Sequence, residues 1–287
     1  MLRPFDRLSR PAFVLALLSA SLSFSLPPAQ AAHHEAATAN VDALLDEAIE
    51  GAHRSAANRA RDLYRSPKTT LQFFGLQADM TVVEISPSAG WYSEILAPVL
   101  RDHGQYHAAV PQITSGMPEV MRKRDSAFRE KLTSSPKLYG DVKITSYDAA
   151  APSFAPAGSA DLLLTFRNVH NWAKAGHTDA MFKGFYAALK KGGVLGLVEH
   201  RANPGTELQE QIDSGYMTED YVIAAAERAG FRLEASAEIN SNWRDTKDHP
   251  GGVWTLLPNL RGVTEADKPK YLQIGESDRM TLRFVKP

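Results

Sequence analysis

The stretch VVEISPSAGWYSEILAP, residues 82–98, carries the strongest fold signal in the chain. It reads as a buried strand, then a turn of small residues, then a helix. In an open parallel sheet, ligands bind beyond the carboxyl ends of the strands, and the helix that follows the first turn offers free N–H groups to them. We therefore expect this turn to hold a nucleotide-like cofactor, although Ser86 and Ser88 stand where glycines are the usual residues.

Strand-like and helix-like segments alternate on both sides of this turn. Apolar runs predict strands over residues 81–85, 104–110, 141–147, 160–166, 194–200, 231–239 and 278–287. Helical spacing predicts helices over residues 91–100, 117–132, 177–193 and 218–230. Near-continuous apolar strands that alternate with helices are typical of an α/β fold, a doubly wound parallel sheet covered on both faces.

Two further regions flank this alternating pattern. Residues 41–65 predict an amphipathic helix broken near Gly51, and Ser66-Pro67 begins another helix. Residues 240–277 are rich in Gly, Pro and Trp, and they are too long for a simple connection. Such a segment is a binding loop or lid, or else a surface insertion in which Trp243 and Trp254 form a local core.

The first 31 residues have the pattern of a secretory signal peptide. Arg3, Arg7 and Arg10 precede the apolar run PAFVLALLSASLSFSL, and Ala29-Gln30-Ala31 supplies a small-x-small cleavage site. The alternative is an anchor that stays uncleaved. We expect a signal peptide over residues 1–31, a flexible leader and helix over 32–55 and one domain over 56–287, with a periplasmic or secreted product that leaves the membrane after cleavage.

Composition excludes several classes of function. A net charge of -1 and a pI near 6.8 give no electrostatic footprint for nucleic acid or for acidic membranes. The chain has no cysteine, which excludes disulfides and cysteine-based catalysis. A small-molecule substrate is the expected partner, and the oligomeric state stays open.

The stretch VVEISPSAGWYSEIL resembles motif I of the class I S-adenosylmethionine-dependent methyltransferases, in which an acidic residue precedes G-x-G-x-G. The segments LTFRNVHNW, EHRA and GESDRMTLRFVKP are similar to the exported branch of predicted methyltransferases in that superfamily. The resemblance spans residues 56–287. It implies a Rossmann-like, mostly parallel seven-stranded sheet with an antiparallel last strand, and S-adenosylmethionine lying across the carboxyl ends of the first strands.

Residue by residue, the resemblance assigns Ser86, Ser88 and Gly90 to the three glycine positions of the motif and Glu84 to its acidic position. A serine held at positive φ costs about 1–2 kcal/mol, unless this turn has ordinary dihedrals. Trp91, which follows the turn, could stack on the cofactor or belong to the core.

The second and third strands complete the cofactor assignment. The family places an acidic residue for the ribose after the second strand, where this chain has AAVPQ. Losing the hydrogen bond between this acidic residue and the ribose costs about 1.5–3 kcal/mol of binding free energy. Gln112 is a candidate substitute for the acidic residue. Asp148 matches the position that contacts the adenine amine, or else it begins a turn.

The ends of the fourth and fifth strands carry the candidates for chemistry. They run out into FRNVHNW and EHRA, so their side chains should meet on one rim of the sheet. Asn168 is assigned to the cofactor there. Histidine is suited to take a proton near neutral pH, so His170 is the first candidate for the general base and His200 the second, with Asn171 as an orienting hydrogen bonder.

Further roles and alternatives arise on the same rim and at the N-terminus. Arg167 or Arg201 could contact an anionic group of the substrate. Alternatively, these polar residues only cap strand ends. His170, Glu199 and His200 could instead bind a metal, and Ala32-His33-His34, if exposed by cleavage, could bind Cu(II) or Ni(II).

The sequence thus predicts an enzyme that transfers a methyl group from S-adenosylmethionine to a small-molecule acceptor, with no metal assigned. The alternative is a non-catalytic ligand- or metal-binding protein on a methyltransferase scaffold.

Overall fold

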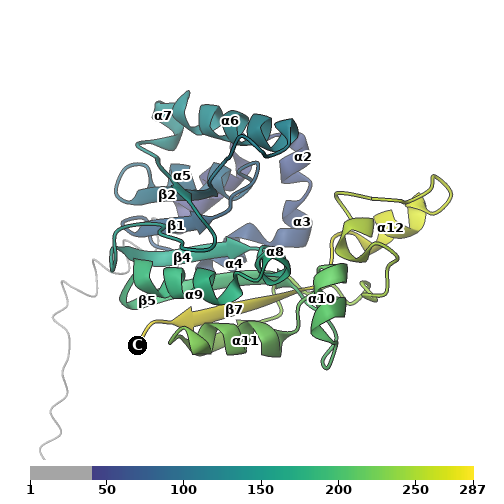
Figure 1. The fold of residues 1–287 in the computed structure, drawn as a ribbon. Coiled ribbons are helices and arrows are strands. Elements are labelled where there is room, and N and C mark those ends of the chain that lie inside the picture. The colour runs from purple at the N-terminus through teal and green to yellow at the C-terminus, as the bar shows by residue number, and fades with distance from the viewer. Residues whose placement is uncertain (1–40) are drawn as a thin grey trace, which may run out of the picture.

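A seven-stranded sheet forms the centre of the molecule, seen here in a computed structural model that describes residues 41–287 (Figure 1). The strands are β1 (Thr81–Ile85), β2 (Gln105–Pro111), β3 (Lys143–Tyr147), β4 (Ala160–Phe166), β5 (Leu189–His200), β6 (Arg232–Ala237) and β7 (Arg279–Val285). Their order is β3-β2-β1-β4-β5-β7-β6. Neighbours are parallel except at β7, which is antiparallel to both β5 and β6. The sheet is therefore mixed, and mostly parallel.

Helices cover both faces of the sheet. They are α2 (Ala56–Arg59), α3 (Asp62–Arg65), α4 (Pro67–Phe73), α5 (Ser93–Leu100), α6 (Glu119–Thr133), α7 (Pro136–Tyr139), α8 (Val169–Ala175), α9 (Thr178–Ala188), α10 (Leu208–Ser214), α11 (Glu219–Arg228) and α12 (Lys268–Ile274), with a 3-10 turn η1 (Gly252–Thr255). One core lies between the sheet and α4, α5 and α6, and the other between the sheet and α8, α9 and α11. The predicted doubly wound α/β architecture is confirmed.

Several boundaries differ from the sequence prediction. The helix expected over 177–193 ends at Ala188, because residues 189–193 extend β5 instead; Gly192 N donates to Lys286 O (2.8 Å) and Lys286 N donates to Gly193 O (2.9 Å). α5 begins at Ser93 rather than at residue 91. α8 was not predicted at all, since its seven residues directly follow a strand and are too few to show helical periodicity.

The N-terminal helices belong to the same packed body. Residues 41–50 are helical, and Val41, Leu45 and Ala48 of this helix lie in the core, although the sequence reading separated them from the domain. The predicted break at Gly51 and the start of α4 at Pro67 are confirmed.

The predicted signal peptide and Ala32-His33-His34 lie outside the described residues. Between residues 41 and 287, no helix combines the length and the apolar character needed to cross a bilayer.

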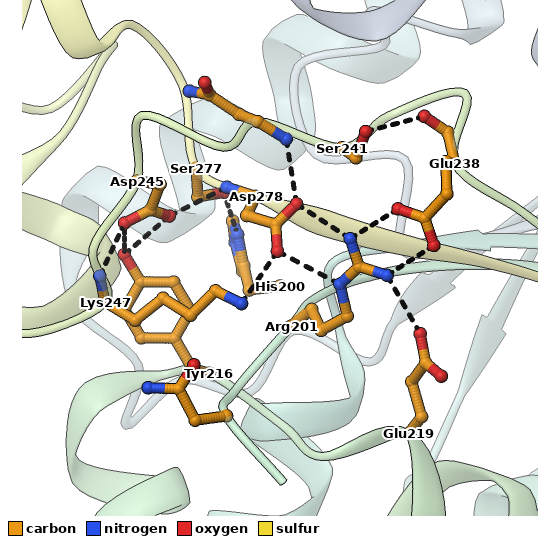
Figure 2. Close-up of polar contacts among 12 residues, drawn as sticks. His200, Arg201, Tyr216, Glu219, Glu238, Ser241, Asp245, Lys247, Ser277 and Asp278 are labelled. Atoms are coloured by element: carbon orange, nitrogen blue, oxygen red, sulfur yellow. Dashed lines mark hydrogen bonds and ion pairs between the residues drawn. The ribbon is translucent and has the colours of Figure 1, made fainter.

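The long segment before β7 carries η1 and α12 and projects beyond α10 (Figure 1). Asp245, which is buried, fixes it to the body. Its carboxylate accepts hydrogen bonds from Tyr216 Oη (2.9 and 3.0 Å), His249 Nε2 (2.9 Å) and the amides of Lys247 (3.0 Å) and Asp278 (2.7 Å). Figure 2 shows Asp245 facing Tyr216 beside Asp278.

The two tryptophans of this segment have different surroundings. The Trp243 side chain is 86% exposed, so it forms no local core. Trp254 lines a cavity at the carboxyl ends of the strands. The segment is thus anchored in the body and contributes to that cavity.

Candidate active site

Two cavities meet at the turn between β1 and α5. The first, of about 450 Å³, lies toward the ends of β4, β5 and β7, and the second, of about 470 Å³, lies at the ends of β2 and β3. Residues 86–88, Arg124, Asn168 and Asn171 line both. This turn therefore lies between two cavities at the edge of the sheet where parallel α/β folds bind ligands.

The turn keeps a glycine-like backbone although two of its residues are serines. The φ angles of Ser86, Ser88 and Gly90 are 51°, 57° and 81°. The Ser86 hydroxyl is 2.6 Å from Tyr147 Oη, which helps to hold that position. A Cβ on Gly90 would lie 3.0 Å from the Phe128 ring. Left-handed serines cost about 1–2 kcal/mol each, and such strain persists where the surrounding structure holds it, commonly at ligand sites.

Glu84, the acidic residue of the motif, is buried behind the turn. Its Oε2 accepts hydrogen bonds from Ser93 Oγ (2.8 Å) and Tyr106 Oη (2.5 Å). Burial raises the pKa of Glu84 to about 7, against the lowering effect of these two hydrogen bonds. Glu84 lines the first cavity with a carboxyl group that titrates near neutral pH.

The second cavity is mostly apolar and suits a planar heterocycle. Its lining includes Val110, Ile113, Met117, Phe128 and Trp172. Asp148, predicted to contact adenine, is exposed outside the lining, and its Oδ1 accepts from Ala150 N (2.9 Å), which matches the turn alternative. The Gln112 side chain is also exposed outside the lining.

His170 lies in the first turn of α8, where Glu199 holds it. Glu199 Oε1 is 3.1 Å from His170 Nδ1, and Oε2 accepts from the amide of Val169 (2.5 Å) at the start of the helix. Because a carboxylate only accepts, we assign the proton of neutral His170 to Nδ1. His170 lines the first cavity, and its Nε2 is then free of a proton and can accept one.

His200 lies beside His170 with a ring separation of 5.5 Å. Its Nδ1 is 2.5 Å from Ser277 Oγ, a contact also drawn in Figure 2. Burial, and then the neighbouring His170, hold the pKa of His200 well below its ordinary value. His200 is therefore a weakly basic, neutral side chain, so His170 is better suited as a general base.

The predicted three-residue metal set does come together. Ligand atoms of His170, Glu199 and His200 lie within 4.8 Å of one another. Both oxygens of Glu199 already accept hydrogen bonds, Oε1 also from the amide of His200 (2.8 Å). A metal would have to replace these bonds, so the arrangement favours Glu199 as the residue that orients His170.

The remaining predicted residues occupy different places around the cavities. Trp91 is core and cavity lining at once: its Nε1 donates to Asn58 O (3.0 Å). Asn168 Nδ2 donates to Ile85 O and Thr165 Oγ1 (both 3.2 Å), which ties β1 to β4. Asn171 is exposed at the mouth of both cavities.

Of the two arginines proposed for an anionic group, only Arg167 lines a cavity. Arg201 lies in a separate network with Asp278, Glu238 and Glu219, as Figure 2 shows.

Sequence reasoning missed the arginines on the N-terminal side of the first cavity. Arg61 and Arg65 line it from the region of α3, and Arg279 lines it from β7. The i, i+4 spacing of Arg61 and Arg65 was a usable signal, because it places both on one side of a helical turn. Nothing in the pattern connected them to Arg279, which is over 200 positions away.

Comparisons with known proteins show the fold of this chain. No protein-family model matches it, and no curated protein does either. Among solved structures, an S-adenosylmethionine-dependent methyltransferase from Aquifex aeolicus is 16% identical, with a TM-score of 0.53 over 79% of this chain and 93% of its own. A putative sarcosine dimethylglycine methyltransferase from Galdieria sulphuraria is 11% identical, with a TM-score of 0.51 over 81% and 88%.

A third similar structure is the [4+2]-cyclase SpnF, at 13% identity and a TM-score of 0.56 over 87% of this chain and 94% of its own. The chain therefore has the fold of the S-adenosylmethionine-dependent methyltransferases. Because a cyclase shares that fold, the reaction has to be argued from the site.

Proposed function

We propose that this protein transfers a methyl group from S-adenosylmethionine to a small-molecule acceptor. The observation that carries the proposal is the turn at residues 86–90, which keeps three positive φ angles at the end of β1, where two cavities meet. S-adenosylmethionine, when bound, supplies a methyl group activated by its sulfonium. The second cavity would hold the adenosine, since its lining is apolar and adjoins the turn.

The first cavity would hold the acceptor. His170 Nε2 takes the proton from the nucleophile of the acceptor. The resulting imidazolium is stabilised by Glu199, which contacts His170 Nδ1. Val253 and Trp254 line the same cavity and supply apolar surface beside His170. Trp254 meets the His170 ring edge to face, with ring centres 5.9 Å apart, and so limits its rotation.

The direct test is calorimetric binding of S-adenosylmethionine and S-adenosylhomocysteine to the purified protein. We expect micromolar affinity, and we expect Gly90→Asp to abolish it, because a side chain there enters the turn and meets Phe128. Gly158→Asp is the matched control: its φ is 64°, but no heavy atom lies within 4 Å of the added Cβ. The proposal fails if neither compound binds, or if Gly90→Asp binds normally.

Catalysis is tested separately with S-adenosylmethionine labelled in its methyl group. Label should pass to a small molecule in an extract of the culture medium or the periplasm. Binding of S-adenosylhomocysteine without any transfer would favour the alternative of a non-catalytic binding protein.

As part of the proposal, the protein acts outside the cytoplasm as a cleaved product. The support is the sequence pattern of residues 1–31. N-terminal sequencing of the protein from the periplasm or medium should begin at Ala32. A full-length protein that stays with the cytoplasm would contradict this location.

A further inference from the structure

Four arginines surround one carboxylate on the N-terminal side of the first cavity. Arg61 Nε lies 2.6 Å from Glu276 Oε1, and Arg65 Nε lies 3.1 Å from Glu276 Oε2. Arg279 also pairs with Oε2, and Arg167 Nη1 lies 3.7 Å from it. We call these four residues the arginine cluster. Its members come from the N-terminal helices and from the ends of β4 and β7, so the fold brings them together at the cavity.

The charges of the arginine cluster are not balanced. Four guanidinium groups against one carboxylate leave an excess of three positive charges (4 − 1 = 3). Glu84 is the other carboxyl group of the lining, and it already accepts from Ser93 and Tyr106. Buried charges without a partner are strongly unfavourable. The cluster therefore has room, electrostatically, for a further anion.

Two donor atoms of the cluster point to the same conclusion. Arg65 Nη1 and Arg279 Nε are buried and have no hydrogen-bond partner among residues 41–287. The Arg65 side chain is only 3% exposed, and it lines the cavity. Burial, followed by the charge of Arg167, holds the pKa of Arg65 well below its ordinary value. Burial likewise lowers the pKa of Arg167 to about 10.

We propose that the arginine cluster binds an acid group, a carboxylate or phosphate, of the methyl acceptor. The acceptor is then a small anionic molecule, held by its acid group at the cluster while its nucleophile lies near His170. This assignment rests on the proposed methyl transfer.

The carboxylate of the cofactor is the other source of an acid group. S-adenosylmethionine also carries a sulfonium and an ammonium group, so the whole cofactor has a net positive charge. Binding it at the arginine cluster would add to the excess positive charge there rather than offset it. The charge balance therefore favours the acceptor.

The test uses inorganic phosphate as the probe and measures its affinity by calorimetry, beside that of S-adenosylhomocysteine. Arg61→Gln and Arg167→Gln are the informative variants, because these side chains are 23% and 24% exposed and their loss is tolerable for folding. Arg232→Gln is the matched control, since Arg232 is exposed at the start of β6 and outside the cavity.

We expect each cluster variant to weaken phosphate binding about tenfold to a hundredfold, which corresponds to one lost charged hydrogen bond. Arg232→Gln should leave phosphate affinity unchanged. S-adenosylhomocysteine should bind all four proteins, wild type included, with the same affinity to within about threefold.

Three outcomes would overturn the assignment. Phosphate could fail to bind the wild type at millimolar concentration, or could bind the cluster variants as well as the wild type. Alternatively, S-adenosylhomocysteine could lose as much affinity as phosphate, which would place the cofactor's carboxylate at the cluster. If S-adenosylhomocysteine binds none of the proteins while phosphate binding follows the arginines, the methyl-transfer proposal fails and the anion site itself stands.

Discussion

His170 has a carboxylate on one side and a cavity on the other. Glu199 is fully buried. One of its oxygens accepts a hydrogen bond from the start of α8, and the other contacts His170 Nδ1. The position of the imidazole is thus fixed by the same residue that would stabilise its protonated form. Such a pair suits proton removal from a hydroxyl, amine or acid nucleophile at near-neutral pH.

Replacing His170 should separate catalysis from binding. We expect His170→Gln to lower methyl transfer about 10²- to 10⁴-fold, the usual contribution of a general base, while the affinity for S-adenosylhomocysteine stays within about threefold. His103→Gln, at an exposed position before β2, is the control and should keep full activity. Unchanged turnover in His170→Gln, measured with the labelled-methyl assay, would remove His170 from the mechanism.

Glu84 should make stability depend on pH. Burial raises its pKa from 4.5 to about 7, so the folded protein keeps a proton that the unfolded chain releases. The associated stability is complete below pH 4.5 and is lost as the pH rises to about 7. Relative to Glu84→Gln, the wild-type free energy of unfolding should fall by roughly 3 kcal/mol across this window.

Urea unfolding at a series of pH values measures this difference. The contributions of His200 and Glu276 are common to both proteins and cancel. Glu50→Gln, at an exposed position, should follow the wild-type curve at every pH. If the free energy of unfolding depends on pH in the same way for wild type and Glu84→Gln, the pKa of the Glu84 carboxyl is not raised by folding.

Replacing Ser88 with glycine should stabilise the folded protein, whereas the same replacement at an ordinary exposed serine should destabilise it. The φ of Ser88 is 57°, and its side chain is exposed. Relief of about 1–2 kcal/mol of strain exceeds the cost of about 0.4–1 kcal/mol for a more flexible unfolded chain. Ser88→Gly should therefore raise the free energy of unfolding by about 0.5–1 kcal/mol, whereas Ser115→Gly, which does not start from a positive φ, should lower it. An equal loss of unfolding free energy in the two variants would show that the backbone of Ser88 is not strained.

Long regular elements were predictable and short ones were not. The expected bounds of β1 and β4 are confirmed, because apolar runs bounded by turns are strong signals. α8 was missed because seven residues after a strand give no clear period, and that error placed His170 on a strand end instead of a helix start. β5 begins five residues early because its first residues pair with the chain after β7, a long-range contact that local sequence does not encode.

The buried carboxylate of Asp245 joins the segment before β7 to the body of the protein. We expect Asp245→Asn to lower the free energy of unfolding by about 2–3 kcal/mol, since the amide would bring N–H donors into a position surrounded by donors. Urea denaturation measures the change. Asp248→Asn is the control: Asp248 is exposed, its side-chain partner is Thr246, and its replacement should change stability by less than about 0.5 kcal/mol. A similar small effect for Asp245→Asn would show that the segment is held by other contacts.

The whole molecule assembles its site from segments that are distant in sequence. The motif turn, the end of β4 and the end of β5 could be placed together from the pattern alone, because parallel strands end at one edge. The N-terminal helices and the segment before β7 could not, since they enclose the first cavity through side chains such as Arg65 and Trp254 that no periodicity connects. For this reason the turn after β1 was predictable and the surroundings of the first cavity were not.

A crystal structure of the protein with S-adenosylhomocysteine would show directly whether the cofactor binds at the turn after β1. We expect the adenine in the second cavity, against Val110 and Met117, and the sulfur beside the turn at residues 86–88, facing the cavity that His170 lines. An adenine bound in the first cavity against the arginine cluster, or bound away from this turn, would contradict it.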